Sequence, residues 1–320
     1  MLRIPTVLTA DELIERAFKK ASKVNVIGKS KRDMIKQKNL AKVNSVADTI
    51  SSTLEKYVSA FPTLEKLPAF YREIIDLLIG LDELKKSLGA SDWCAKQVRS
   101  VARINRAKIK RSRNVKEMDE SREAMYGRSA SLVKQISKEL IFLNKARNQI
   151  KNMPTISPEM RTIVIAGAPN VGKSLLVAAI SSAKPKVAIY PFTTKEISVG
   201  VLTVKRTRYQ VIDTPGLLDR PFEDRNEIEL QAIIALRHLA DLVVFLLDPT
   251  GTCGYPLDYQ LSLLDGIRVL YPDARIVVVE NKSDLHRGEE GNLKISALTK
   301  EGIGELTQVI EKELSMKTQS

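Results

Sequence analysis

The chain has 320 residues, of which 43% are hydrophobic and 28% are charged, so it is long enough for two globular domains and too apolar for wholesale disorder. No apolar run approaches the roughly 20 residues of a membrane-spanning helix, and the N-terminus lacks the order of a secretion signal. We therefore expect a soluble, cytoplasmic protein without a membrane partner. Its two cysteines, Cys94 and Cys253, lie far apart and lack CxxC spacing, which argues against a disulfide framework and a zinc site.

The charge of the chain is unevenly distributed. Residues 1–155 carry 32 lysines and arginines against 17 acidic residues, whereas the whole chain has a net charge of +13. The basic excess therefore lies entirely in the N-terminal half. This asymmetry indicates two domains with different roles.

The first half of the sequence predicts an antiparallel helical bundle. Thr9, followed three residues later by Glu12, is a capping-box signature that opens the first helix. Apolar residues at three- and four-residue steps form one stripe over residues 43–61, and Pro62 ends that helix. We assign residues 1–153 to this all-α domain. Further helices are expected over residues 69–78, 91–112 and 117–151.

Beyond the bundle, strands alternate with helices. Pro154 and Pro158 mark a linker over residues 154–160. The alternating pattern indicates a six-stranded, mostly parallel α/β sheet covered on both faces, here over residues 161–316 with a tail at 317–320. The strands are expected near residues 162–166, 197–204, 208–213, 241–247, 275–280 and 293–295.

The sequence GAPNVGKS, residues 167–174, follows the first strand and precedes a helix. This is the context of a phosphate-binding loop, in which glycines let backbone N–H groups face the phosphates. The Lys173 ammonium can reach the β- and γ-phosphates, and the Ser174 hydroxyl can bind Mg²⁺. The nucleotide contacts expected here come from Pro169, Asn170, Val171, Gly172, Lys173, Ser174 and Leu175.

A second motif predicts that the base is guanine. Residues 281–284, NKSD, follow an apolar strand in the NKxD pattern, where the Asp284 carboxylate can accept two hydrogen bonds from guanine that adenine does not offer. The stem of Lys282 can lie over the purine, and Asn281 can tie the base loop to the phosphate loop. GTP is therefore favoured over ATP. The base contacts are expected from Asn281, Lys282, Asp284, Ser296, Ala297 and Leu298, the last three through a backbone N–H to guanine O6.

Two further loops complete a Mg²⁺-dependent hydrolytic site. Asp213 opens the sequence DTPG, in which its carboxylate can hold Mg²⁺ through water and the Gly216 N–H can sense the γ-phosphate. A threonine in the sequence YPFTT can complete the Mg²⁺ shell, and we favour Thr194 over Thr193. The expected catalytic residues are Lys173, Thr194 and Gly216, and the expected metal ligands are Ser174, Thr194 and Asp213.

The mechanism of hydrolysis stays open at two positions. Leu217 stands where Ras-type enzymes have a water-positioning glutamine, so intrinsic hydrolysis should be slow or use another water-orienting group. The side-chain oxygen of Asn170 can hold a monovalent cation such as K⁺ beside the phosphates, and a loop-shaping role is an equal alternative. The only histidines, His238 and His286, have no acid or nucleophile partner in the pattern, so no histidine-dependent triad or metal centre is expected.

The basic excess of the first half suggests a polyanionic partner. Six cations at three- and four-residue steps share one expected helix face and can match a row of phosphates, although a solvated face is the alternative. Few aromatic residues lie nearby, and the stripe lacks the apolar enrichment of membrane-surface helices, so folded RNA fits best. The candidate RNA contacts are Lys96, Arg99, Arg103, Arg106, Lys110 and Arg113.

These motifs together resemble the Obg-related GTPases. The stretches GAPNVGKS, PFTTK, LDRPFEDRN and NKSD are similar to the nucleolar GTP-binding protein 1 family with its archaeal members, and IPTVLTADELIERAF, AMYGRSASLVKQ and KNMPTISPEMRT are similar to that family's helical domain. The resemblance covers essentially the whole chain. It implies a Ras-like P-loop GTPase domain with GTP, GDP and Mg²⁺ as ligands, and a role in large ribosomal subunit assembly through ribosomal RNA binding.

From these observations we expect a monomeric, nucleotide-gated RNA-binding GTPase. Two other functions stay open at this point: a GTPase switch that acts on a protein or membrane partner, and a nucleotide-binding module with negligible turnover. RNA binding that does not respond to salt would favour the first, and the absence of phosphate release would favour the second.

Overall fold

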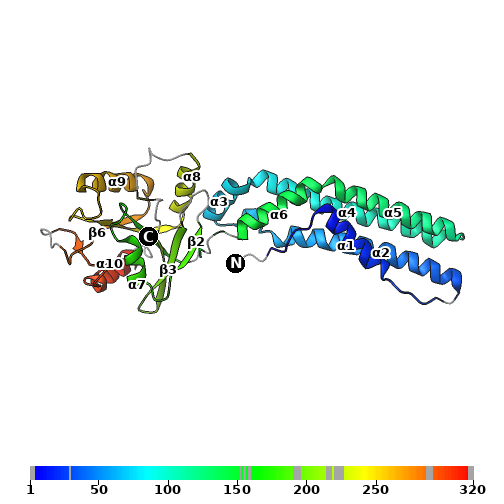
Figure 1. Cartoon of the computed structure of the whole chain (residues 1–320), viewed down its shortest axis with the longest axis horizontal. Coiled ribbons are helices and arrows are strands. Elements are labelled where there is room, and N and C mark those ends of the chain that lie inside the picture. The colour runs from blue at the N-terminus through cyan, green and yellow to red at the C-terminus, as the bar shows by residue number, and fades with distance from the viewer. Residues whose placement is uncertain are drawn as a thin grey trace. The chain divides into compact units, whose positions relative to one another are not determined.

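The computed structural model of this protein (Figure 1) describes residues 4–28, 30–151, 153, 156–157, 160–189, 196–213, 218–219, 227–285 and 291–315. Its contacts divide the chain into two units. The first unit comprises residues 1–66 and 79–151, and the second comprises residues 67–78 and 152–320. Within the described ranges, no helix combines the length and the apolar character needed to span a bilayer.

The first unit consists of helices, as the sequence predicted (Figure 1). The Thr9 hydroxyl accepts a hydrogen bond from the Glu12 N–H, and the Glu12 carboxylate accepts one from the Thr9 N–H, so the predicted capping box is present. The Ser30 hydroxyl accepts from the Asp33 N–H at 3.2 Å and caps the second helix. The helices are α1 (Ala10–Ser22), α2 (Lys31–Ala60), the 3₁₀ helix η1 (Leu64–Lys66), α4 (Leu81–Arg111), α5 (Val115–Gln135) and α6 (Ser137–Lys151).

Apolar side chains at helical spacing form the core of this unit. α2 packs along α4, and α1, α5 and α6 pack against this pair. Ile50 and Leu54 of α2 and Val98 of α4 are fully buried. Each such side chain stabilises the bundle by about 1.5–3 kcal/mol relative to exposure to water, so this stripe is the main source of its stability.

Two helix boundaries differ from the sequence prediction. α4 begins ten residues earlier than expected, directly after Gly80, whose φ is 76°. The helix expected over residues 117–151 is broken at Ile136, whose N–H bonds to the Val133 carbonyl at 3.3 Å and tightens the turn before Ser137 starts α6. Neither proline nor glycine stands at this break, so the sequence pattern did not predict that the helix would be interrupted here.

The short helix α3 (Ala69–Ile79) packs with the second unit, although the sequence predicted it in the bundle. Its residues Phe70 and Ile74 are buried in the second unit's core together with Ile156. The Tyr71 hydroxyl donates to the Ile156 carbonyl and accepts from the Ile156 N–H at 3.1 Å. Ile156 lies in the segment predicted as a linker. Its apolar side chain is buried, which removes it from water and joins this segment to the second unit's core.

His238, which follows α8 (Glu227–Arg237), has an acid partner on α3. Its Nε2 lies 2.8 Å from a carboxylate oxygen of Glu73, so the prediction that this histidine lacks an acid partner is wrong. The two residues are 165 positions apart, and only the packing of α3 brings them together. His286 lies outside the described residues.

The second unit is built on a seven-stranded, mostly parallel sheet of order β2-β3-β4-β1-β5-β6-β7 (Figure 1). β3 pairs antiparallel with β2 and β4, and the other neighbours pair parallel. The strand added to the six predicted ones is β2, a four-residue edge strand that is too short to stand out in the sequence. The strands are β1 (Thr162–Ala166), β2 (Lys186–Ile189), β3 (Glu196–Val204), β4 (Thr207–Asp213), β5 (Ala240–Leu247), β6 (Arg275–Glu280) and β7 (Leu293–Lys294).

Helices cover both faces of this sheet, with α8 and α9 on one face and α7 and α10 on the other (Figure 1). The central strand β1 is buried along its whole length, which explains its uninterrupted apolar sequence. β1, β4, β5, β6 and β7 run in the same direction, so the loops that follow them lie at one edge of the sheet. The helices are α7 (Lys173–Ile180), α8 (Glu227–Arg237), α9 (Leu257–Leu270) and α10 (Ile303–Ser315).

Replacing Ile74 by alanine should destabilise the second unit by about 2–5 kcal/mol, because the truncated side chain leaves a cavity in that unit's core. Calorimetry of the full chain measures the change, and the fluorescence of the single tryptophan, Trp93 of α4, reports the first unit separately. Arg72→Ala, at an exposed position of α3, is the matched control and should unfold like the wild type. A calorimetric profile of Ile74→Ala that matches the wild type would contradict the assignment of α3.

Candidate nucleotide-binding site

The loop between β1 and α7 has the backbone geometry of a phosphate cradle. Gly167 and Gly172 have φ angles of 140° and 102°, which favour glycine. A Cβ at Gly172 would lie 2.3 Å from the Asn281 Nδ2, and a Cβ at Gly167 would lie 2.5 Å from the Leu246 carbonyl oxygen. Both glycines are therefore required by close neighbours as well as by their own backbone. The N–H groups at the start of α7 complete the cradle.

Lys173 is the first residue of α7 and is buried. Its ammonium donates to the carbonyl oxygens of Gly167 at 2.8 Å and Ala168 at 2.7 Å, which holds the side chain within the loop. Burial lowers the pKa of this ammonium, and the nearby carboxylates of Asp219 and Asp213 oppose that shift. The positive charge therefore lies beside the N–H groups that would surround a phosphate.

The Ser174 hydroxyl donates to the Asp213 Oδ2 at 2.5 Å. Asp213 ends β4 and is 1% exposed, whereas Ser174 is exposed at the start of α7. A hydroxyl and a carboxylate at this distance supply the hard oxygen donors that Mg²⁺ prefers, so the residues present fit this ion. The other residues expected at the metal and the γ-phosphate, Thr193, Thr194, Gly216 and Leu217, lie outside the described residues.

Asn281 connects three loops. Its side-chain amide donates to the Val171 carbonyl at 2.7 Å, and its side-chain oxygen accepts from the Ala297 N–H at 2.9 Å. Asn281 is 4% exposed and directly follows β6. The phosphate loop and the loops after β6 and β7 are thereby held together.

The remaining residues predicted to contact the base lie in the same two loops. Asp284 is exposed in the turn after β6, so its carboxylate is accessible to a ligand. The Ser296 N–H donates to the Glu301 carbonyl at 3.0 Å, which makes this residue part of the loop framework. Leu298 is 71% exposed. The loop after β7 therefore combines a buried start with an exposed end.

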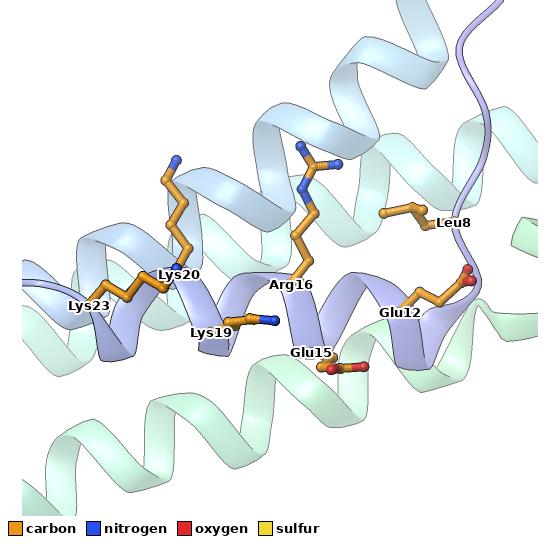
Figure 2. A pocket seen from close by; sticks show the side chains of 7 residues that line it. All are labelled: Leu8, Glu12, Glu15, Arg16, Lys19, Lys20 and Lys23. Carbon is orange, nitrogen blue, oxygen red and sulfur yellow. The ribbon is translucent and has the colours of Figure 1, made fainter.

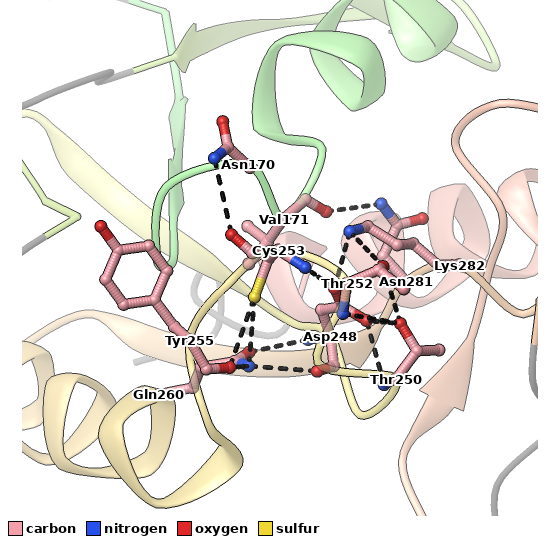
Figure 3. Close-up of polar contacts among 10 residues, drawn as sticks. All are labelled: Asn170, Val171, Asp248, Thr250, Thr252, Cys253, Tyr255, Gln260, Asn281 and Lys282. Carbon is pink, nitrogen blue, oxygen red and sulfur yellow. Dashed lines mark hydrogen bonds and ion pairs between the residues drawn. The ribbon is translucent and has the colours of Figure 1, made fainter.

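The structure adds a fourth loop that sequence reasoning missed, between β5 and α9 (Figure 3). Asp248 directly follows β5, is fully buried, and accepts a hydrogen bond from the Lys282 ammonium at 2.6 Å. Burial raises the pKa of the Asp248 carboxyl, but donors from Lys282, Thr250 and Cys253 and the charge of Lys282 outweigh burial and lower the pKa to about 2. An aspartate at the end of an apolar strand was the available signal, since β4 ends in the same way at Asp213.

Asn170 joins this fourth loop to the phosphate loop. It is exposed, has a φ of 60°, and its amide nitrogen points at the Cys253 carbonyl oxygen, 3.5 Å away (Figure 3). Its side-chain oxygen points away from that contact (Figure 3). The geometry thus leaves the oxygen on the open side of the loop, where the sequence analysis considered a monovalent cation.

The predicted basic stripe of the first unit is partly neutralised. Lys96 pairs with Asp92 at 2.5 Å and Arg99 with Glu55 at 2.6 Å. Arg106 is half-buried and donates to the Asn44 side-chain oxygen at 2.9 Å. Arg103, Lys110 and Arg113 are exposed, although Arg113 lies beyond the end of α4. Lys96 and Arg99 are exposed as well, so the C-terminal end of the stripe is distinguished from them by their ion pairs and not by accessibility.

A second group of cations lies along α1, in an open groove of about 510 Å³ (Figure 2). The cations Arg16, Lys19, Lys20 and Lys23 follow the carboxylates of Glu12 and Glu15 along the chain. The groove is lined by Leu8, Glu12, Glu15, Arg16, Lys19, Lys20 and Lys23.

A glycine-containing loop between a buried strand and a helix, a carboxylate at the end of β4 and an NKxD loop after β6 meet at one edge of a mostly parallel sheet. Together with this topology they define a P-loop GTPase fold, preceded by helices. The NOG1 N-terminal helical domain matches residues 2–157, and the family description for nucleolar GTP-binding protein 1 matches residues 227–284. The chain belongs to the nucleolar GTP-binding protein 1 family, and the resemblance noted in the sequence is confirmed.

The chain is similar to proteins from several organisms. An uncharacterised protein from Methanocaldococcus jannaschii is 39% identical over 294 residues, which cover 88% of this chain and 80% of that protein. Nucleolar GTP-binding protein 1 from Arabidopsis thaliana is 36% identical over 80% of this chain and 38% of its own length. A crystal structure of a nucleolar GTP-binding protein 1 from Plasmodium falciparum is 32% identical, covers 52% of this chain and 92% of that chain, and has a TM-score of 0.47. The chain spans 38–45% of the length of the eukaryotic relatives it matches.

Proposed function

We propose that this protein binds GTP with Mg²⁺, hydrolyses it slowly to GDP and phosphate, and acts as a nucleotide-gated ribosomal-RNA-binding factor in assembly of the large ribosomal subunit. One observation carries the nucleotide part of the proposal: Asn281 holds the NKxD loop against the phosphate loop through Val171, at 2.7 Å. Base reading and phosphate binding then act on one ligand. The names of the eukaryotic relatives, which are nucleolar GTP-binding proteins, agree with this ligand and with a ribosomal role.

In this proposal Ser174 and Asp213 hold Mg²⁺, which would neutralise charge on the phosphate oxygens when bound. The ammonium of Lys173 supplies a second positive charge from within the loop. Thr194 and Gly216 are proposed to contact Mg²⁺ and the γ-phosphate, respectively. Because these two loops would bind only when the γ-phosphate is present, their order would change with hydrolysis.

The base assignment predicts a change of preference in Asp284→Asn. An amide in place of the carboxylate presents both a donor and an acceptor, so xanthosine nucleotides should gain and guanosine nucleotides should lose affinity. Competition binding of GDP and XDP to wild type and variant measures the ratio of the two dissociation constants. A ratio that is equal in both proteins would remove the guanine assignment.

Asn170 is proposed to hold K⁺ beside the phosphates through its outward-pointing oxygen, where a fixed positive charge would stabilise charge that develops during hydrolysis. GTP hydrolysis should therefore be faster in K⁺ than in Na⁺, and Asn170→Ala should abolish the difference. A multiple-turnover assay of phosphate release in the two salts measures it. Equal rates in both salts would contradict a cation role.

The absence of any phosphate release, with or without ribosomal particles, would support a nucleotide-binding module instead.

The helix α3 supports the gating part of the proposal. It is joined at both ends to segments of the first unit, yet its side chains lie in the core of the second unit. Its Glu73 contacts His238, one residue beyond the end of α8. If α8 moves when the bound nucleotide changes, that movement would act on α3, whose neighbours in the chain belong to the first unit. This connection gives the nucleotide state a physical route to the first unit.

RNA binding is proposed for the exposed cations of the first unit, with Arg103, Lys110 and Arg113 as the exposed cations at the C-terminal end of the predicted stripe. Changing these three to glutamine should weaken binding to ribosomal RNA. It should also reduce the magnitude of the slope of log affinity against log salt concentration by about 2 to 3, because each phosphate contact releases about 0.7–0.9 counterions and three contacts are lost. Fluorescence anisotropy at several salt concentrations measures this slope.

The control for this experiment is a triple variant with the same loss of charge at exposed positions of the second unit, Arg206, Arg208 and Lys300. It should retain the wild-type slope. An equal effect of both triple variants would mean that net charge alone matters. Binding that ignores salt, or no RNA binding at all, would favour a protein or membrane partner for the GTPase.

A further inference from the structure

The loop that follows β5, residues 248–256, lies beside the NKxD loop and contacts it through one charged pair (Figure 3). This pair joins Asp248 to Lys282, the residue whose stem is expected over the purine. Asp248 is 0% exposed. A buried carboxylate has lost its hydration, so hydrogen-bond donors and positive charges must stabilise it. The partners of Asp248 therefore indicate its role.

The two carboxylate oxygens of Asp248 have different partners. Oδ1 accepts from the Thr250 N–H at 3.0 Å and from the Thr250 hydroxyl at 2.5 Å, the local contacts that shape an aspartate-initiated turn. Oδ2 accepts from the Lys282 ammonium at 2.6 Å, the Cys253 N–H at 2.8 Å and the Thr252 hydroxyl at 3.1 Å. Oδ1 therefore has partners only within its own turn among these contacts, whereas Oδ2 combines two contacts within its loop with a charged side chain from a different loop.

The backbone of Asp248 is fixed as well. Its N–H donates to the Gln260 side-chain oxygen at 2.8 Å, and its carbonyl accepts from the Gln260 amide at 3.0 Å. Gln260 is itself fully buried on α9. The carboxylate is thus anchored to a helix and cannot follow Lys282 if that side chain moves.

Lys282 is held firmly at both of its ends. Its φ of 65° is a left-handed conformation that costs a residue with a Cβ free energy, so the surrounding contacts must maintain it. Its ammonium donates to Asp248 and, at 2.8 Å, to the Thr252 hydroxyl. With backbone and ammonium both fixed, the four-carbon stem between them has little freedom left.

We propose that Asp248 is a positioning residue for guanine-nucleotide binding: it anchors the Lys282 ammonium so that the aliphatic stem of Lys282 forms a preformed surface for the purine ring. The inference rests on the proposed function, since it concerns how the same site receives the base. The energetic reason is preorganisation, because a lysine side chain that is already ordered loses less conformational entropy when the nucleotide binds. The ionised state of Asp248, with its lowered pKa, is consistent with this anchoring role.

Asp248→Asn tests the proposal because asparagine retains the oxygen that shapes the turn and replaces the other by an amide that cannot accept from an ammonium. Release of a fluorescent GDP analogue, chased with excess GDP, should become about tenfold faster, as expected for loss of one charged hydrogen bond. Asp265→Asn, the same chemical change at an exposed ion pair on α9, is the control and should release the analogue at the wild-type rate.

A double-mutant cycle separates positioning from a purely structural role. Lys282→Met retains an unbranched apolar side chain and removes the ammonium, so Asp248→Asn should weaken equilibrium binding of the analogue much less in this background than in the wild type. An equal loss in both backgrounds, or an unchanged release rate in Asp248→Asn alone, would overturn the proposal. If Asp248→Asn does not fold, Thr252→Val is the variant to use instead. This change at an exposed position removes the second partner of the Lys282 ammonium and should speed release of the analogue several-fold. A wild-type protein that binds no guanine nucleotide would instead refute the proposed function.

Discussion

The side-chain amide of Asn281 is the contact on which the candidate site depends. It is the only group described above that bonds to the phosphate loop and to the loop after β7 at the same time, through Val171 and Ala297. A buried amide that loses a partner costs about 1–3 kcal/mol, so these hydrogen bonds favour the arrangement in which the three loops lie together. The requirement for glycine at position 172 follows from the same contact, because the Asn281 nitrogen occupies the space that a Cβ would need.

Buried charge is the second constraint on this edge of the sheet. Lys173, Asp213 and Asp248 are all buried near the ends of central strands. Ion pairs in the interior stabilise a fold poorly compared with apolar groups, because each charge gives up its hydration. Their concentration at the edge where the loops meet therefore favours a role in binding a charged ligand.

The division of the chain into two units gives α3 its importance. The chain leaves the first unit after η1, contributes one helix to the core of the sheet domain, and returns to the first unit at α4. Such a path joins the two units by three covalent connections rather than by one linker. The second unit's core therefore includes a helix whose neighbours in the chain, on both sides, belong to the first unit.

The sequence by itself determined what depends on neighbours in the chain. The capping box of Thr9 and Glu12, the stripe on α2, the alternation of strands and helices and the loop motifs all follow from spacings of a few residues, which local sterics and hydrogen bonds fix. The one strand it missed, β2, is a short strand at the sheet edge that gains its ladder from β3.

Tertiary structure decided the rest. An apolar stripe predicts that one face of a helix is buried, but it does not indicate against which surface. The residues of α3 alone therefore could not assign this helix to the sheet domain. The contacts of Glu73 with His238 and of Asp248 with Lys282 join residues that are distant in sequence, and no local pattern encodes them. They exist because packing of the whole chain fixes these partners within hydrogen-bond distance and withdraws water from the charged groups.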